Sequence, residues 1–381
     1  MNKIYFISNY FVPLGRANAN RAFMVKYFHE EGWDIEVVAG KDHKSYILSF
    51  QEDHSLWDII PSILKIHRFS ARPGWFSYDV GEFLKRPDNV RRHWIAEAER
   101  NLVLSEKGII YAIVPPLDNA VLAYKLACKY DYPLVLYYVD DDVCEVESKI
   151  FARANLIICV TPQIKDNLVA RYGQRNIHVV ANGYLEEIKV SEKTAVNDPL
   201  RLIYAGSMTF RTGPEVFAQA YNLLASENPS LAQKLSIDFY APSNYYSFLF
   251  LKKHLNPNIR FKGFLPFRDL MKELPSYDIA LASTKGEISF TSKIYQYLNA
   301  GLPIFTSSDD QCLKKFIEKN RVGLTASRRI TDVADQLKEL INHPERIADW
   351  RKNVRAIKPQ FSFKKRIEGI SQLLKNNFNH S

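Results

Sequence analysis

The chain of 381 residues is 46% hydrophobic and 24% charged, and it carries a net charge of +9 at pH 7. This length favours two domains, and the composition is that of a globular protein rather than of a disordered or fibrous chain. No segment approaches the roughly 20 consecutive apolar residues that a membrane-spanning helix needs, so the sequence predicts no such helix.

The first half of the chain alternates predicted strands and helices. Apolar runs of strand length are bounded by turn residues, and the segments between them repeat apolar residues with helical spacing. Such alternation predicts an α/β fold, with a doubly wound parallel sheet that is covered by helices on both faces. We expect strands over residues 3–9, 35–40, 108–114, 133–139, 154–160 and 177–181, and helices over residues 18–31, 118–131 and 161–172.

The interval 41–107 does not fit this alternation. It mixes aromatic with basic side chains, which is typical either of a seat for a carbohydrate, a lipid phosphate or single-stranded nucleic acid, or of an added layer of packed helices. Nucleic acid is disfavoured, because residues 1–183 carry 22 Lys and Arg against 22 Asp and Glu and therefore have no basic excess. The aromatic side chains meant here are those of Trp57, Trp75, Phe76, Tyr78, Phe83 and Trp94.

A polar interval over residues 186–199 is the expected linker between two domains. The alternation then restarts, which predicts a second doubly wound sheet, and such sheets bind ligands at the carboxyl ends of their strands. We expect strands over residues 201–205, 236–240, 259–263, 278–282, 303–307 and 322–326, and helices over residues 214–224, 245–255, 267–274, 292–300 and 312–319.

The loop after the first strand of each half is suited to phosphate. Gly15, Arg16 and Asn18 lie before the first helix, where small residues permit close approach to a helix N-terminus. The corresponding loop of the second half begins with Gly206 and Ser207. Neither loop contains GxGxxG or a P-loop lysine, which argues against a dinucleotide or an ATPase site.

Two further residues of the second loop add specific contacts. Arg211 offers a planar set of donors to phosphate oxygens, and Met208 is suited to pack against a base.

The predicted helix over residues 292–300 combines an apolar stripe with polar groups in its first turns. Ser292, Lys293 and Gln296 lie near its N-terminus, where free N–H groups and the helix dipole favour an anion. A lysine with two neutral hydrogen-bonding side chains suits a diphosphate joined to a sugar or nucleoside. A capped surface helix explains the same residues.

Three successive acids, Asp140, Asp141 and Asp142, follow a predicted strand. Mutual repulsion can raise the pKa of one of them toward the range of a general base, and Asp140 is nearest the strand end. The alternative is a helix N-cap followed by first-turn acids. The spacing gives no firm metal site.

The basic excess lies in the second half, and residues 351–375 contain eight Lys and Arg against a single Glu. Such a segment either contacts an anionic membrane surface or forms a solvated helical face. The N-terminus has no signal-peptide pattern, and the four cysteines lack metal-ligand spacing. We therefore expect a cytoplasmic protein, and the inner face of the membrane is its place of contact under the first of these two interpretations of the basic segment.

In their joint order these segments resemble the GT-B glycosyltransferases that use nucleotide sugars. The resemblance is carried by residues 11–16, 31–35, 154–161, 177–184, 202–207, 261–263, 277–283 and 292–303. It implies two Rossmann-like domains that face a cleft: an acceptor domain over residues 1–185, onto which a tail over residues 360–381 packs, and a nucleotide-sugar domain over residues 200–358. Gly263 and Phe264 join the implied nucleotide-sugar site, and the resemblance implies neither a metal nor a cofactor.

Retaining members of group 1 (family 4) carry a Glu near the sugar and a second Glu that contacts the ribose. Gln296 stands at the second position, and the first falls on Ile288 with Glu287 one residue earlier. Their phosphate-binding Arg and Lys are replaced by Ser207 and Thr212. The resemblance therefore leaves open whether the enzyme inverts or retains.

The xanthan-type glucuronosyltransferase, an inverting GT-B enzyme, is similar in Arg-Ala-Asn at residues 16–18, Gly-Ser-Met at residues 206–208 and the helix over residues 292–297. This likeness implies that Lys293 and Gln296 bind UDP, Met208 lies by the base and Asp140 acts as the base. We expect transfer of a sugar from a nucleotide diphosphate to a glycan or lipid-linked acceptor of a bacterial surface polysaccharide or exopolysaccharide. The alternatives are a UDP-sugar epimerase of the GT-B fold and a non-catalytic paralogue that binds nucleotide or sugar.

Overall fold

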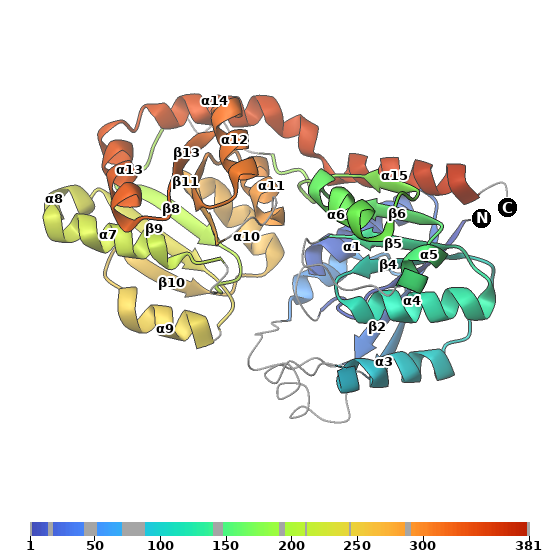
Figure 1. Ribbon diagram of the computed structural model, residues 1–381. Coiled ribbons are helices and arrows are strands. Elements are labelled where there is room, and N and C mark those ends of the chain that lie inside the picture. Colours follow the sequence, from blue (N-terminus) through green and yellow to red (C-terminus); the bar gives the residue numbers. More distant parts are fainter. Residues whose placement is uncertain are drawn as a thin grey trace. The chain divides into compact units, whose positions relative to one another are not determined.

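The computed structural model describes residues 2–13, 18–41, 52–70, 88–139, 148–189, 195–209, 212–243, 245–285 and 291–378. The chain divides into two compact units (Figure 1), Met1–Asn182 with Phe363–Ser381 as unit 1 and Gly183–Ser362 as unit 2.

Unit 1 is an α/β unit built around one parallel sheet. Its strands are β1 (Lys3–Ile7), β2 (Asp34–Lys41), β3 (Lys65–Ser70), β4 (Ile109–Val114), β5 (Leu134–Tyr138), β6 (Leu156–Cys159) and β7 (Ile177–Val179). Its helices are α1 (Asn18–Glu30), α3 (Asp88–Asn101), α4 (Leu117–Tyr130), α5 (Ser148–Arg153), α6 (Pro162–Tyr172) and α15 (Phe363–Phe378), together with the 3-10 helix η1 (His54–Ile59).

The strand order of unit 1 is β3-β2-β1-β4-β5-β6-β7, and the described pairs are all parallel. The chain runs outward from β1 in one direction and from β4 in the other, so right-handed crossovers place α1 and α4 on opposite faces. Helices α3, α4 and α5 contact one another in a row, and α1 contacts α15. The boundary between β1 and β4 is the topological switch point of this sheet.

Strand β3 corrects the sequence analysis, which assigned no strand within residues 41–107, whereas helix α3 agrees with its alternative of an added layer of packed helices. Only Phe69 of β3 is buried, because the strand lies at the sheet edge and its other side chains meet solvent. Lys65 and His67 pair with Glu36 of β2 at 3.4 and 2.7 Å. These polar residues conceal a strand in the sequence, and Trp94 of α3 is a buried packing residue.

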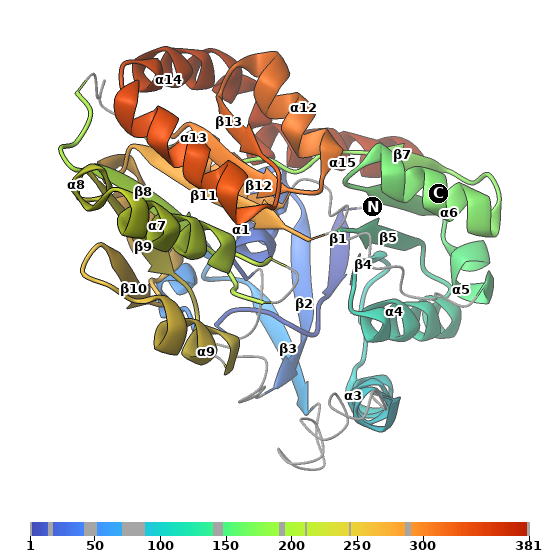
Figure 2. The same ribbon diagram turned by 60° about the vertical axis from the view of Figure 1, so that its left-hand side comes forward.

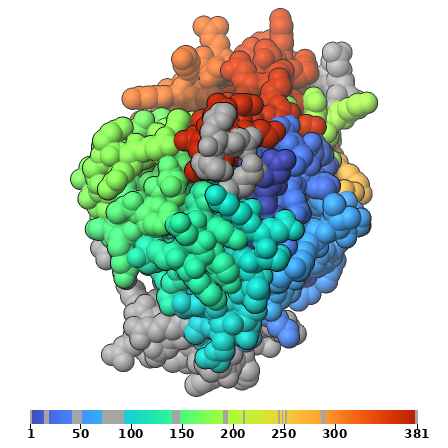
Figure 3. Space-filling model, turned by 90° about the vertical axis from the view of Figure 1, so that its right-hand side faces the viewer, coloured from blue at the N-terminus to red at the C-terminus, as the bar shows by residue number. Residues whose placement is uncertain are grey.

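The C-terminal helix α15 belongs to unit 1. Its apolar side packs on α1, where the rings of Phe363 and Tyr27 lie 6.4 Å apart. The indole N–H of the buried Trp33 donates a hydrogen bond to Ser371 Oγ at 2.8 Å. Figure 3 shows the red C-terminal segment beside the blue N-terminal segment on one face.

Unit 2 repeats the same architecture. Its strands are β8 (Leu200–Ala205), β9 (Leu235–Tyr240), β10 (Ile259–Gly263), β11 (Ile279–Thr284), β12 (Ile304–Ser308) and β13 (Gly323–Ala326). Its helices are α7 (Glu215–Glu227), α8 (Pro229–Ala232), α9 (Tyr245–His254), α10 (Phe267–Glu273), α11 (Ser292–Asn299), α12 (Gln311–Asn320), α13 (Ile330–Asn342) and α14 (Arg346–Ile357), with the 3-10 helices η2 (Leu274–Ser276) and η3 (Lys358–Phe361).

The sheet of unit 2 has the order β10-β9-β8-β11-β12-β13 and is parallel. Each face carries its own hydrophobic cluster because successive strand residues point to opposite sides. Ile279 and Leu281 of β11 join the cluster under α7 and α13, whereas Ala280 and Ala282 join the cluster under α10, α11 and α12. Figure 2 shows α7 and α13 side by side over the strands. The predicted fold class, two Rossmann-like parallel sheets, is confirmed.

The basic segment over residues 351–375 is largely helical, and several of its cations have partners within the chain. Arg351 forms a buried ion pair with Asp278 at 2.8 Å, and Lys364 pairs with Glu30 at 2.8 Å. Lys358 and Lys375 donate to the carbonyl oxygens of Ile188 and Glu31. Contact with a membrane surface stays a prediction. Among the described residues, no helix is both long and apolar enough to cross a bilayer.

Candidate active site

The topological switch point of unit 2 lies between β8 and β11. In a doubly wound sheet, the connections that follow the two strands at this point run to opposite faces of the sheet. They leave a crevice for a ligand at the carboxyl ends of the two strands. The loop after β8 leads to α7, and the segment after β11 leads to α11. The structure therefore brings together two segments that the sequence analysis selected separately, Gly206–Ser207 and Ser292–Gln296.

Lys293 lies in the first turn of α11, directly against the end of β8. Its ammonium is 4.4 Å from the centre of the Tyr204 ring and donates to Tyr204 Oη at 3.4 Å. No carboxylate in the described part of the chain pairs with this ammonium. Desolvation by burial lowers the pKa of Lys293 to about 8, because the charged form lacks both water and an opposite charge.

The N-terminus of α11 adds further donors for an anion. Thr291 is the N-cap residue, and its side chain makes no capping hydrogen bond. Ser292, the first residue of the helix, is partly buried beside it. The N–H groups of Ser292 and Lys293 therefore lie at the start of the helix without a capping side chain from Thr291, next to the ammonium of Lys293.

Gln296 follows Lys293 by one helical turn, so that both side chains lie on the same side of α11. It is only 7% exposed, and neither its amide nitrogen nor its amide oxygen has a hydrogen-bond partner in the described structure. A buried amide without partners costs free energy. A ligand that offers hydroxyl groups would satisfy both the donor and the acceptor of this side chain.

The loop after β8 is held by backbone and side-chain hydrogen bonds. Gly206 has φ +148°, a conformation that side chains rarely adopt, and its N–H donates to Tyr240 O at 3.0 Å. The carbonyl oxygen of Ser207 accepts from Tyr204 Oη at 2.8 Å and from Thr212 Oγ1 at 3.0 Å. Met208 is fully buried in the cluster under α7, and this packing explains the residue without a nucleotide base.

Gly263 and Phe264 follow β10, which lies at the edge of the sheet and is separated from β8 by β9. Gly263 has φ +76°, and its carbonyl oxygen accepts from Ala241 N at 3.0 Å. Phe264 is partly buried. Both residues lie at the same carboxyl edge as Lys293, but two strand positions from the switch point.

Several predicted site residues lie outside the described residues. Asn18 begins α1, and its side chain is not described. The predicted site residues outside the described ranges are Gly15, Arg16, Asp140, Arg211 and Glu287.

Unit 1 has a buried polar cluster at its own switch point, which the sequence analysis missed. The N–H of Asn9, after β1, donates to Asn119 Oδ1 at 2.8 Å, and its side-chain amide donates to Asp118 Oδ2 at 2.6 Å. Arg21 of α1 is buried nearby; burial lowers the pKa of this guanidinium to about 10, while Tyr10 and Asp118 oppose the shift. In the sequence, Asp118 and Asn119 are ordinary first-turn residues of a predicted helix, and nothing in the local pattern indicated that they are buried.

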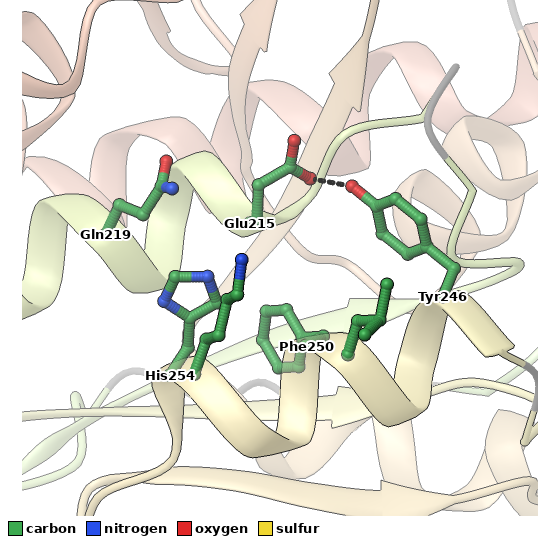
Figure 4. Close-up of a pocket in the computed structure, with 7 residues that line it drawn as sticks. Glu215, Gln219, Tyr246, Phe250 and His254 are labelled. Atoms are coloured by element: carbon green, nitrogen blue, oxygen red, sulfur yellow. Dashed lines mark hydrogen bonds between the residues drawn. The ribbon is translucent and has the colours of Figure 1, made fainter.

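A pocket of about 230 Å³ lies in the groove between α7 and α9 (Figure 4). Glu215 accepts from Tyr246 Oη at 2.5 Å and from Lys285 Nζ at 3.1 Å. Burial and the neighbouring Glu215 raise the pKa of Tyr246, and burial lowers the pKa of His254. None of Ser292, Lys293 and Gln296 lines this pocket, which is therefore distinct from the candidate site. Its lining consists of Glu215, Gln219, Tyr246, Leu249, Phe250, Lys253 and His254.

Residues 199–343, which run from β8 to the end of α13, match the family model of the glycosyl transferases group 1. The sequence matches no curated protein. Solved structures share the fold along the whole chain. Anabaena Alr3699/HepE in complex with UDP and glucose is 16% identical, with a TM-score of 0.69 over 99% of this chain and 100% of that one.

Two other solved structures agree in fold. Sucrose-phosphate synthase from Thermosynechococcus elongatus is 13% identical, with a TM-score of 0.75 over 100% of both chains. The pneumococcal O-GlcNAc transferase GtfA, in complex with UDP and GlcNAc, is 13% identical, with a TM-score of 0.67 over 98% of this chain and 99% of that one.

The fold is therefore the GT-B fold, and the match over residues 199–343 places the group 1 glycosyltransferase signature in unit 2. The chain is a glycosyltransferase. The finer likeness to the xanthan-type glucuronosyltransferase stays a prediction.

Proposed function

We propose that this chain transfers a sugar from a UDP-sugar to a glycan or lipid-linked acceptor in the synthesis of a bacterial surface polysaccharide or exopolysaccharide. The relatives of similar fold include one solved with UDP and glucose and one solved with UDP and GlcNAc, which supports a uridine nucleotide as donor. Catalysis at the cytoplasmic side of the membrane is part of the proposal.

The observation that carries the proposal is that Lys293 and Gln296 lie on the same side of α11 at the switch point of unit 2. Lys293 presents an ammonium without a carboxylate partner in the described residues, and Gln296 presents an amide without hydrogen-bond partners. A nucleoside diphosphate supplies what both lack. Its phosphates carry the negative charge that Lys293 needs, and its ribose or the attached sugar carries hydroxyl groups for Gln296.

The chemistry follows from charge development on the leaving group. As the bond between the sugar and the diphosphate breaks, negative charge grows on the β-phosphate. Lys293 and the uncapped first turn of α11 would stabilise that charge in a site where little water competes. In this proposal the cationic and dipolar groups of the chain stabilise the leaving group without a metal, and Arg211 is a further cation that contributes.

The acceptor would be activated in unit 1. Asp140, which follows β5, is the proposed base for an inverting reaction and would take the proton of the acceptor hydroxyl. Glu287 is the alternative acid near the sugar for a retaining reaction. Gly15, Arg16 and Asn18, with the interval 41–107, would shape the acceptor side.

A binding panel tests the donor class. UDP, UDP-glucose, UDP-GlcNAc, GDP and ADP are titrated calorimetrically into the intact protein, into Lys293→Met and into Lys272→Met. Lys272 is an exposed lysine of the same unit that pairs with Asp269. We expect UDP compounds to bind best, with Lys293→Met about 10- to 100-fold weaker, the usual range for a charge-assisted contact, and Lys272→Met unchanged. No binding of any nucleoside diphosphate would sink the proposal.

The stereochemical outcome needs a separate measurement. Proton NMR of the product during the first turnovers gives the anomeric configuration. Inversion together with loss of transfer in Asp140→Asn would support Asp140 as the base, whereas transfer unaffected by Asp140→Asn would remove that role.

A further inference from the structure

Arg328 follows β13 and reaches back across the carboxyl edge of unit 2. Its Nη1 donates to the carbonyl oxygens of Thr284 and Ser307 at 3.3 and 3.4 Å, and its Nη2 donates to that of Gly213 at 3.4 Å. These carbonyls belong to three segments: the end of β11, strand β12 and the turn before α7. One guanidinium thus joins the two strands to the turn that closes the loop after β8.

Gly213 fits this contact closely. Its φ is +50°, and a Cβ at this position would lie 2.6 Å from Arg328 Nη2 and 2.7 Å from Lys285 Cε. The preceding residue is tied to the same strand, because Ser283 Oγ donates to Thr212 O at 2.5 Å. The turn is therefore held against β11 by a hydroxyl and a guanidinium. A side chain at position 213 would be strained by the positive φ and would press on the guanidinium.

The charge of Arg328 is not balanced locally. No carboxylate in the described residues forms an ion pair with it, so that its partners are three carbonyl dipoles. A guanidinium can donate to several acceptors in one plane, whereas an ammonium is a compact point charge that cannot span them in the same way.

A short chain of hydrogen bonds links Arg328 to the candidate site. Gly213 N donates to Thr209 O at 2.9 Å, and Thr212 Oγ1 donates to Ser207 O at 3.0 Å. Ser207 O also accepts from Tyr204, whose ring lies under the ammonium of Lys293. A displacement of the turn over residues 212–213 is therefore passed to the groups that hold Lys293.

We propose that Arg328 is a positioning residue of the donor site. It holds the turn over residues 212–213, and through that turn Ser207, in place beside Lys293, and so sets the affinity for a nucleoside diphosphate. The inference rests on the proposed function of this site and extends it to a residue that the sequence analysis did not select. Arg328 acts through Gly213 and Ser207 rather than by touching the donor.

The first test measures the affinity of the intact protein for UDP by calorimetry. Arg328→Ala is expected to bind at least tenfold more weakly than the unsubstituted protein, and Arg328→Lys is expected to lie between the two. The matched control is Arg329→Ala, because Arg329 is the adjacent residue, is 78% exposed and pairs with Asp332. Its affinity is expected within twofold of the unsubstituted protein. An unchanged UDP affinity in Arg328→Ala would overturn the proposal. If Arg328→Ala does not fold, the UDP affinity of Arg328→Lys is measured instead, and an unchanged value has the same meaning.

The second test needs no nucleotide and therefore separates this inference from the proposed function. Hydrogen exchange of the backbone amides of Gly213 and Phe217 is followed in the free protein. Faster exchange at both in the Arg328 variants, with Arg329→Ala unchanged, supports the tie. Unchanged exchange in Arg328→Ala contradicts it. If the unsubstituted protein does not bind UDP, the proposed function is contradicted, but the hydrogen-exchange result on the contact between Arg328 and Gly213 is unaffected.

A double-mutant cycle tests the route through Gly213. Gly213→Ala places a Cβ against the guanidinium, so we expect it to weaken UDP binding by removing the same contact. The double variant Gly213→Ala with Arg328→Ala should then bind no more weakly than the poorer single variant. Fully additive losses would show that the two residues act separately, contrary to the proposal.

Discussion

At the residue scale, the meaning of Lys293 and Gln296 depends on what surrounds them. A lysine over a tyrosine ring and a glutamine one turn later are unremarkable in a helix. Here the ammonium has no carboxylate partner in the described structure, and the amide is buried without partners. The ammonium therefore lacks an opposite charge and the amide lacks hydrogen-bond partners, and a ligand that carries negative charge and hydroxyl groups would supply both.

Lys293 makes nucleotide affinity dependent on pH. In the free protein desolvation lowers its pKa to about 8, and a bound diphosphate would raise that pKa, because the charged form gains an opposite charge. Binding should therefore take up a proton above about pH 8, and affinity should fall as the pH rises through this value. Below about pH 7 the lysine is charged in both states and no uptake is expected.

Calorimetry in two buffers of different ionisation enthalpy, from pH 6.5 to 9.5, counts the protons taken up. Lys293→Met is the control and should show no such uptake. Equal affinity of the unsubstituted protein at pH 7 and pH 9.5 would show that Lys293 does not meet the diphosphate.

Gln296→Met separates stability from binding. The substitution removes an amide that is buried without partners, so we expect the free protein to gain about 1–3 kcal/mol of unfolding free energy. UDP affinity should fall at least tenfold, since the donor and the acceptor for the ligand are lost. Thermal unfolding and calorimetry measure the two effects.

Gln233→Met is a suitable comparison, because Gln233 is exposed in the same unit and its substitution should change neither quantity. A Gln296→Met protein that is less stable and binds UDP normally would mean that the amide has a structural partner and no ligand.

At the element scale, the site depends on how α11 is fixed to β8. Tyr297, on the inner side of α11, is buried against the end of that strand. The N–H of Ala205 donates to its hydroxyl oxygen at 2.8 Å, and the hydroxyl donates to Ala205 O at 3.1 Å. The helix that carries Lys293 is thus bonded to the strand that leads to Gly206.

Tyr297→Phe is expected to weaken both the fold and the site. It leaves the N–H and carbonyl of Ala205 buried without this partner, which costs about 1–3 kcal/mol. The freedom gained between α11 and β8 should reduce UDP affinity by about three- to tenfold. Denaturant unfolding and calorimetry at a temperature where the variant is folded give the two values.

Tyr221→Phe is the matched control. Tyr221 of α7 is also buried, and its hydroxyl donates to Ala232 O of α8 at 3.0 Å, away from α11. We expect it to lose stability but to bind UDP as the unsubstituted protein does. An equal loss of affinity in both variants would show that stability alone controls binding.

The strands differ in how well they can be predicted from the sequence. Central strands such as β4, in which every residue is buried, are continuous apolar runs and were predicted. Edge strand β3 was missed, because its polar side chains pair with Glu36 of the neighbouring strand. Pairings between residues 29 and 31 positions apart leave no local trace in the sequence.

At the scale of the whole molecule, unit 2 is an insertion into unit 1. Its ends meet, since the N–H of Tyr184 donates to Phe361 O at 2.8 Å. It also has a hydrophobic cluster on each face of its sheet. The chain leaves unit 1 after Asn182 and returns to it at Phe363.

We therefore expect a fragment of residues 183–362 to fold cooperatively by itself and to bind UDP. Circular dichroism during thermal unfolding should show one sharp transition, because each face of the sheet is covered within the fragment. A fragment of residues 1–182 should be unstable without residues 363–381, since α15 covers α1 and Trp33 donates to Ser371. An unfolded 183–362 fragment would mean that its stability comes from unit 1.

The sequence by itself determined the α/β class, the two sheets and the selection of the helix with Lys293, because buried strands, helix periods and glycine stops are local patterns. It did not determine that Lys293 would lie over Tyr204, that Gln296 would lack a partner, or that Arg328 would reach Gly213. Those facts depend on residues 89 to 115 positions apart that meet only when the strands pair in the order β8-β11-β12-β13. Burial and the choice of partner are properties of the packed sheet, and so only the tertiary structure decided them.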